Sequence, residues 1–335
     1  MQSPVPPTTP TRASSCAGVT TLLGATLLAF TTLPLPATAQ QYPEKPVTLV
    51  VPFAVGSQVD LLVRTLAENF SKALNQPFIV LNRDGAGGIL AVASVAQSKP
   101  DGYTLGYGTQ GPFTIQPQLR RDLRYKIDEF DFICQTNSGS LIVAVGPKSP
   151  FKSLRDLIEA ARKAPGTLTF ASVGIGTGPH LIAEAIALEA KVKFLHVPFR
   201  SVPDMTAQFM NGTVDFIVTT PILLTTNREV RALAVAGSPR LKSHPDVPLL
   251  AELDFKRSAI PAYLGLFAPK GMPAAALASL RRVCPAVANT DAFRKVSDSI
   301  ASPVEYADAP QYTQNVLQDQ RQMAELINAL SIKAE

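Results

Sequence analysis

Residues 47–82 read VTLVVPFAVGSQVDLLVRTLAENFSKALNQPFIVLN, and this stretch decides the fold. The β-branched run 47–53 predicts a strand, the apolar residues of 59–74 recur at helical spacing, and 77–81 again has the composition of a strand. A glycine and a serine, Gly56 and Ser57, stand between the first strand and the helix. The stretch therefore predicts a strand–helix–strand unit of the kind that builds α/β sheets.

The same alternation continues along most of the chain, whose 335 residues are enough for two domains. Strands alternating with helices over this length predict an α/β protein whose parallel sheets carry helices on both faces. The stretch from Pro310 to Ala334 predicts an amphipathic helix that packs back on the first lobe. We expect further strands at 102–108, 131–145, 167–172, 193–197, 214–219 and 231–236, and further helices at 88–98, 153–163, 179–190 and 203–211.

The first 39 residues have the pattern of a targeting segment. A lone basic residue, Arg12, precedes an apolar run from Val19 to Leu33, and Ala37-Thr38-Ala39 fits the small-x-small rule for signal peptidase. We therefore expect a secretory signal peptide cleaved before Gln40 and a mature protein in the periplasm. The alternative is an uncleaved anchor, although the run is shorter than the about 20 apolar residues of a membrane span.

Charge and cysteine content narrow the class of protein. The formal net charge is +5, and lysine and arginine form no run of five or more, which argues against nucleic-acid binding. After cleavage two cysteines remain, Cys134 and Cys284, too few for a disulfide framework or a cysteine-rich metal site. One bridge between them is compatible with an oxidising compartment. Two unpaired, buried thiols are the favoured expectation.

Two similar segments indicate crossings between lobes, VAVGPKSP at 143–150 and LGLFAPKGMP at 264–273. Each is an extended apolar run that ends in a proline- and glycine-containing break. The chain is expected to leave the first lobe at one of them and to return at the other. The alternative interpretation is two ordinary strands that end in turns.

Three predicted strands run into glycine-containing loops that open helices, at 50–60, 82–88 and 170–180. Helix N-termini carry unpaired backbone N–H groups and the positive end of the helix dipole, so each loop can hold an anion. In open α/β sheets such loops gather at the C-terminal strand ends, where ligands bind. Taken singly, each loop is also compatible with a packing turn, and only their recurrence favours a binding site.

The sequence contains none of the common nucleotide-binding, zinc-binding or hydrolase motifs. The run 174–178, GIGTG, lacks the third glycine of a dinucleotide fingerprint, and no phosphate-binding G-x-x-x-x-G-K-[ST] occurs. The three histidines, His180, His196 and His244, include no H-E-x-x-H pair, and no G-x-S-x-G elbow is present. We expect His180 to cap or pack a helix and His196 to be a core histidine. The sequence predicts no catalytic residue, no metal site and no cofactor.

The order of several short pieces resembles the substrate-binding proteins of tripartite tricarboxylate transporters, the Bug or TctC-like family. The resemblance covers nearly all of the chain from Tyr42 onward. The matching pieces are YPEKPVTLVVPF at 42–53, Asp60, NRDGAGG at 82–88, KPDGYTLGYGT at 99–109, HVPF at 196–199, VDF at 214–216, RALAV at 231–235, HPDVP at 244–248 and LFAPKGMP at 266–273.

The resemblance implies a type II periplasmic-binding-protein fold, in which two α/β lobes joined by two crossover segments close over a ligand cleft. It divides the chain into a signal peptide at 1–39, lobe 1 at 40–143 plus 266–335, and lobe 2 at 144–265. It further implies a monomeric periplasmic protein, not an enzyme, that captures a small carboxylate and delivers it to membrane transporter subunits. Two alternatives remain, a solute sensor that partners a two-component sensor kinase and a periplasmic enzyme.

Carried onto this sequence, the family's pocket is built from main-chain amides and hydroxyl groups. Compared with the family, the first loop has Ser57 and Gln58 where glycines are common, Phe199 replaces a tyrosine, and Thr219 and Thr220 replace an Asp-Asn pair. The lost acid and phenol favour a ligand without an amino group and with an apolar or aromatic body. The implied pocket residues are Phe53, Gly56, Ser57, Gln58, Gly87, Gly88, Thr109, Gln110, Ser172, Gly174, Thr177, His180, Phe199, Thr219 and Thr220.

Overall fold

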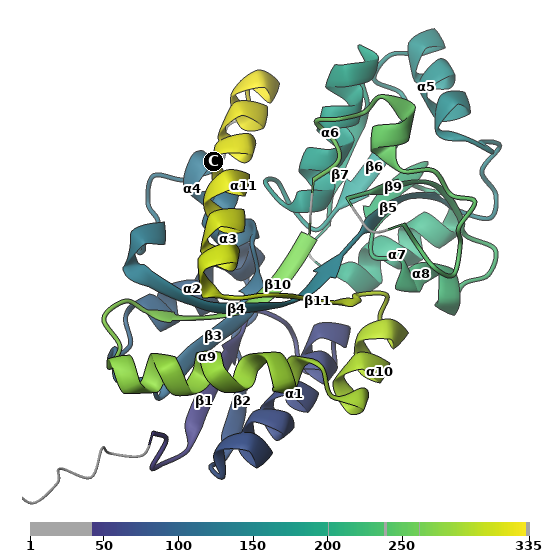
Figure 1. Cartoon of the computed structure of the whole chain (residues 1–335). Helices are drawn as coiled ribbons and strands as arrows, with labels where there is room; N and C mark the ends of the chain where they lie inside the picture. The colour runs from purple at the N-terminus through teal and green to yellow at the C-terminus, as the bar shows by residue number, and fades with distance from the viewer. Residues whose placement is uncertain (1–41, 200, 238–239, 261, 333–335) are drawn as a thin grey trace, which may run out of the picture. The chain divides into compact units, whose positions relative to one another are not determined.

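A computed structural model describes residues 42–199, 201–237, 240–260 and 262–332. The predicted signal peptide at 1–39 and its cleavage site lie outside these residues. The described chain builds two β-sheets, one of six strands and one of five, each covered by helices (Figure 1). Over the described residues, no helix combines the length and the apolar character needed to cross a membrane.

The six-stranded sheet has the order β11-β4-β10-β3-β1-β2. Its β1, β2 and β3 run parallel to one another, as the alternation of strands and helices in the sequence predicts. β10 runs antiparallel to both β3 and β4, and β11 is antiparallel to β4. The strands are β1 (Val47–Val51), β2 (Phe78–Asn82), β3 (Thr104–Thr109), β4 (Phe130–Gly139), β10 (Ala262–Pro269) and β11 (Val304–Ala307).

The five-stranded sheet has the order β7-β6-β8-β5-β9. Here β6 is parallel to β7 and β8, while β5 is antiparallel to β8 and β9. The strands are β5 (Leu141–Val145), β6 (Thr169–Ser172), β7 (Leu195–Pro198), β8 (Phe216–Thr219) and β9 (Arg231–Ala236).

Both sheets are mixed, so the expectation of parallel sheets is confirmed for β1–β3 and β6–β8 and is wrong for the remaining pairings. The antiparallel strands β5 and β10 are each the first strand after the chain changes sheet, and at the first change the single residue Ser140 separates β4 from β5. The predicted strand 131–145 is thus two strands, since apolar periodicity does not show a change of sheet. The predicted crossings at 143–150 and 264–273 also start inside β5 and β10, whereas the chain changes sheet at Ser140 and again before Ala262.

Helices cover both faces of each sheet, and the burial of β1 shows the consequence. Val47, Leu49 and Val51 point into a core shared with α1 and α9, whereas Val50 points into a second core with α2, α3 and α11. A strand buried on both faces reads as a continuous apolar run, which is the pattern of 47–51. The helices of eight or more residues are α1 (Gln58–Leu74), α2 (Ile89–Ala96), α5 (Leu154–Lys163), α6 (Gly178–Ala190), α7 (Val202–Asn211), α9 (Ala274–Ala288), α10 (Asp291–Ser299) and α11 (Ala309–Leu330).

Shorter helices join these elements. The long helix α11 packs against a core of each sheet. The short helices are α3 (Gly111–Thr114), α4 (Gln116–Leu119), α8 (Ile222–Thr226) and the 3-10 turns η1 (Ala86–Gly88), η2 (Ile127–Glu129) and η3 (Leu250–Leu253). α11 packs on β4 and α3 as predicted, and its last turns also reach the other sheet. There Met323, Leu326 and Ile327 join the core that includes β6 and α6.

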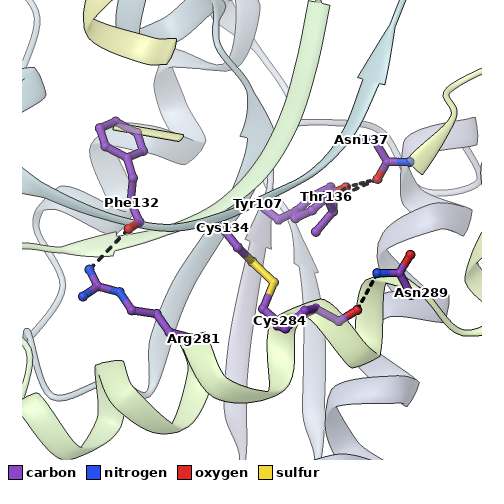
Figure 2. The surroundings of a disulfide bond; sticks show 9 residues. Tyr107, Phe132, Cys134, Thr136, Asn137, Arg281, Cys284 and Asn289 are labelled. Atoms are coloured by element: carbon purple, nitrogen blue, oxygen red, sulfur yellow. Dashed lines mark hydrogen bonds between the residues drawn. A yellow bond between two sulfur atoms is a disulfide. The ribbon is translucent and has the colours of Figure 1, made fainter. Parts of the chain in front are cut away.

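Cys134 on β4 and Cys284 on α9 form a disulfide bond, shown in Figure 2. The expectation of two unpaired thiols is therefore wrong, although both sulfur-bearing residues are buried as predicted. The two residues are 150 positions apart, and only the packing of α9 on the sheet brings them together. Close by, Arg281 of α9 donates to the carbonyl oxygen of Phe132 on β4, at 3.4 Å.

Candidate functional site

The predicted site residues lie where parallel strands end and helices begin. In the six-stranded sheet these ends belong to β1, β2 and β3, and in the five-stranded sheet to β6, β7 and β8. Because neighbouring parallel strands end at the same edge of a sheet, each set of loops forms one edge. We call them the first edge, residues 52–58, 83–88 and 109–111, and the second edge, residues 172–178, 198–199, 201–202 and 219–221.

Asp60 holds the loop between β1 and α1 in place. Its side chain accepts hydrogen bonds from the Gly56 amide at 2.9 Å, from Arg64 Nε at 2.9 Å and from Asn82 Nδ2 at 2.8 Å. Asn82 also donates to the carbonyl oxygen of Phe53. Ser57 is the N-cap of α1 and accepts from the Asp60 amide. The backbone of the loop is therefore fixed at both ends before any ligand arrives.

The environment of Asp60 keeps its carboxylate charged. Burial by itself would raise the pKa, but hydrogen bonds from Arg64, the Gly56 amide and Asn82 outweigh it and hold the pKa of Asp60 below its ordinary value. Only 2% of the residue is exposed, so the charge acts inside the protein and not as a ligand contact. Asp60 is a positioning residue for the first edge.

A comparable network supports the loop between β6 and α6 at the second edge. The buried hydroxyl of Ser172 hydrogen-bonds with His196 Nε2 at 2.8 Å and with both the carbonyl oxygen and the amide of Gly174. The Gly176 amide donates to His180 Nδ1 at 3.3 Å, and the Thr177 hydroxyl donates to Gly174. As expected from the sequence, His180 packs beneath a helix start.

The two histidines are neutral at neutral pH. Burial, together with a smaller effect of the neighbouring His196, lowers the pKa of His180 to about 4. Burial likewise lowers the pKa of His196 to about 4, and the two ring centres lie 4.3 Å apart. A neutral pair contributes no positive charge for an anion, so its role is to support the loop.

Backbone groups at both edges remain open to a ligand. Gly56 and Gly174 have φ angles of +79° and +127°, which favour glycine, and no atom lies within 4 Å of the place a Cβ would take on either. Among the described residues at the two edges, those whose backbone amides donate to no protein acceptor include Val55, Ile175 and Thr177. Their unpaired N–H groups can receive a carboxylate, whereas the amides of Gly56, Gly174 and Gly176 are already engaged.

Gln116 of α4 connects the two edges. Its side-chain Nε2 donates to the carbonyl oxygen of Gly176 at 3.0 Å, and the residue is 5% exposed. A Cβ on Gly87 or on Gly176 would lie 3.5 Å from the same nitrogen. One buried amide therefore touches a glycine of each edge, which places the loops of the two sheets together.

The remaining predicted residues divide into open and buried positions. Gly88 is buried, and a side chain there would collide with Pro112, which accounts for the glycine. Gln110 is buried and its Oε1 accepts from the Tyr263 amide. Gln58 begins α1, but its side chain lies outside the described part of the chain. Half-buried or exposed positions at the edges are Phe53, Gly87, Thr109, Phe199, Thr219 and Thr220.

Two hollows lie away from the edges and include none of the predicted site residues. One of about 580 Å³ is bordered by Arg124, Glu129 and Lys270. The other, about 210 Å³, lies between Tyr263 and Asp319. Over the described residues, no group of three or more His, Cys, Asp or Glu side chains is placed to hold a metal ion.

The comparisons with known proteins agree with this arrangement. Residues 62–332 match the tripartite tricarboxylate transporter family receptor. A UPF0065 protein of Bordetella pertussis is 32% identical over 262 residues, which are 77% of this chain and 80% of that protein.

Two solved structures with bound carboxylates superpose on nearly the whole described chain. A Rhodopseudomonas palustris protein with adipate has a TM-score of 0.79 and 25% identity, covering 87% of this chain and 99% of its own. The MatC protein of the same organism, with malate, has a TM-score of 0.75 and 26% identity, covering 85% and 100%.

Two α/β sheets, each with glycine-containing loops at the ends of its parallel strands, define a protein of the type II periplasmic-binding class. The chain belongs to the tripartite tricarboxylate transporter receptor family, the Bug or TctC-like proteins, as the sequence resemblance predicts. This is a family of solute-binding receptors.

Proposed function

We propose that this chain is a monomeric periplasmic receptor that captures a small carboxylate between the first and second edges and delivers it to a tripartite tricarboxylate-type transporter. The observation that carries the proposal is the Gln116–Gly176 hydrogen bond, which brings together loops with unpaired amides from both sheets. We propose further that the two sheets mark two lobes, divided near the predicted boundaries at 143/144 and 265/266.

Backbone amides can supply the required affinity without a cationic side chain. A hydrogen bond from a neutral donor to a charged group contributes about 1.5–3 kcal/mol. Three such bonds, aided by the dipoles of helices that begin at each edge, reach about −8 kcal/mol, which corresponds to micromolar binding. The unpaired amides of Val55, Ile175 and Thr177 provide such donors. The remaining predicted pocket residues are proposed to line the site or to hold its loops.

Two features support a periplasmic location. The sequence at 37–39 fits a signal peptidase site, and the bond between Cys134 and Cys284 requires an oxidising compartment to persist. Neither feature depends on the ligand.

Native mass spectrometry of protein exported to a bacterial periplasm tests the proposal. We expect a chain that begins at Gln40 and retains a small acid, which denaturation releases chemically unchanged. A protein that retains no acid and gains no thermal stability from any carboxylate in a broad panel would contradict it. Recovery of a modified acid would instead indicate an enzyme.

A further inference from the structure

Exposed apolar side chains lie at the two edges and in the helical turns next to them. Of the twelve large hydrophobic residues that are exposed among the described residues, six lie in the loops or first helical turns that follow β1, β2, β6 and β7. Where exposed apolar side chains form one patch on a protein surface, that patch often marks a binding site. The six are Val55, Leu61, Leu90, Val173, Ile175 and Val202.

Two of these residues also carry the unpaired amides. Val55 is 73% exposed and Ile175 is 46% exposed, and the backbone N–H of each lacks a protein acceptor in the described chain. Each residue therefore offers a polar contact for a carboxylate and an apolar contact for the atoms next to it. Val55 belongs to the first edge and Ile175 to the second.

Around Val55, Val173 and Ile175 the loops carry no charged side chain that could pair with other polar groups of a ligand. Among the described residues of the two edges, Arg83 and Asp84 are the charged ones, and segments 52–57, 86–88, 173–178 and 219–221 contain no Lys, Arg, Asp or Glu. The Ser172 hydroxyl and the His180 ring are buried and already bonded within the loop. A ligand hydroxyl placed against valine and isoleucine would lose its water without gaining a partner, and that loss costs affinity.

We propose that the site selects carboxylates whose body is apolar and carries no hydroxyl or amino group, such as unsubstituted dicarboxylates or aromatic acids. This inference rests on the proposed function and narrows its ligand class. The amides hold the charged end or ends, and the side chains of Val55, Val173 and Ile175 cover the carbon skeleton.

Isothermal titration calorimetry with matched acids tests the inference. Adipate and galactarate share a six-carbon dicarboxylate skeleton and differ by four hydroxyl groups. Two further pairs also differ only in hydroxyl groups, namely succinate with tartrate and phenylacetate with mandelate. We expect the apolar member of each binding pair to bind at least about tenfold more tightly. Equal or tighter binding of the hydroxylated members overturns the inference and leaves the proposed function standing. Failure of every acid to bind overturns both.

A substitution tests whether the preference for acids without hydroxyl groups depends on the loop between β6 and α6. Ile175→Asn is expected to reduce the ratio of the galactarate to adipate dissociation constants by about fivefold or more, because its amide can pair with a hydroxyl. The control is Leu317→Asn on α11, 41% exposed and outside the edges, which leaves the ratio unchanged. Val55→Ser, at a more exposed position, serves if the first variant does not fold. An unchanged ratio in the folded edge variants would overturn the inference.

Discussion

The side-chain Nε2 of Gln116 donates a hydrogen bond to the carbonyl oxygen of Gly176 at 3.0 Å. Gln116 lies on α4, which follows β3 of the six-stranded sheet in the chain. Gly176 lies in the loop between β6 of the five-stranded sheet and α6. A side chain at Gly176 would collide with Leu119 of the same α4 helix, so the close approach depends on glycine. This contact sets the distance between the two edges that we propose to hold the ligand.

Gln116→Ala is expected to weaken carboxylate binding, with adipate as the probe, by about threefold to tenfold. The variant loses one hydrogen bond, worth about 0.5–1.5 kcal/mol, that helps to hold the two edges together. Calorimetric titration measures the change. Gln118→Ala, on the same helix and without a hydrogen bond to the other sheet, is the matched control. Equal affinities of the two variants would show that the contact does not support binding.

Asp60→Asn is expected to lower the free energy of unfolding by about 2 kcal/mol, since the buried charge that receives three hydrogen bonds is lost. Urea denaturation measures this, and Glu68→Gln on the exposed face of α1 serves as the control. The loosened Gly56 loop should also bind adipate more weakly. A stable variant with unchanged affinity would refute the positioning role.

The neutral histidines predict a pH dependence of stability. Because the pKa values of His180 and His196 are lowered to about 4 in the folded chain, the unfolded chain binds more protons between about pH 6.5 and 4. Their contribution is therefore present above about pH 6.5 and is lost as the pH falls through about 4. His180→Gln should flatten this slope in urea unfolding followed from pH 7 to 4. An unaltered slope would mean that His180 does not titrate as described.

Removal of the disulfide is expected to reduce stability and not ligand binding. The double variant Cys134→Ser/Cys284→Ser should lose about 2–5 kcal/mol of unfolding free energy, because the bond closes a loop of 150 residues at a distance from the edges. Thermal unfolding and calorimetry on the same samples separate the two effects. Free thiols detected by alkylation of the unreduced, denatured wild-type protein would contradict the bond itself.

Much of the fold follows from apolar periodicity. The strand 231–236 was predicted with its observed bounds, and the long helices α1, α5 and α6 begin within a residue of their predicted starts. Periodicity carries no information on strand direction, however, so the antiparallel strands β5 and β10 were not distinguished from parallel ones. The disulfide depends on packing between residues 150 positions apart, which no local pattern reveals.

The site was less predictable than the fold. The glycine loops were located from the sequence, since strand–glycine–helix units show where backbone approaches a ligand. The role of Asp60 has a local signal, because Ser57-x-x-Asp60 is a helix-capping pattern that marks a fixed loop. Gln116 has no such signal: only the folded chain brings it to Gly87 and Gly176.

A crystal structure of the mature chain grown with adipate tests the central claim most directly. We predict carboxylate oxygens within hydrogen-bonding distance of the Val55 amide at the first edge and of the Ile175 or Thr177 amide at the second. An adipate bound elsewhere, or held at these edges by charged side chains instead of backbone N–H groups, would contradict the account.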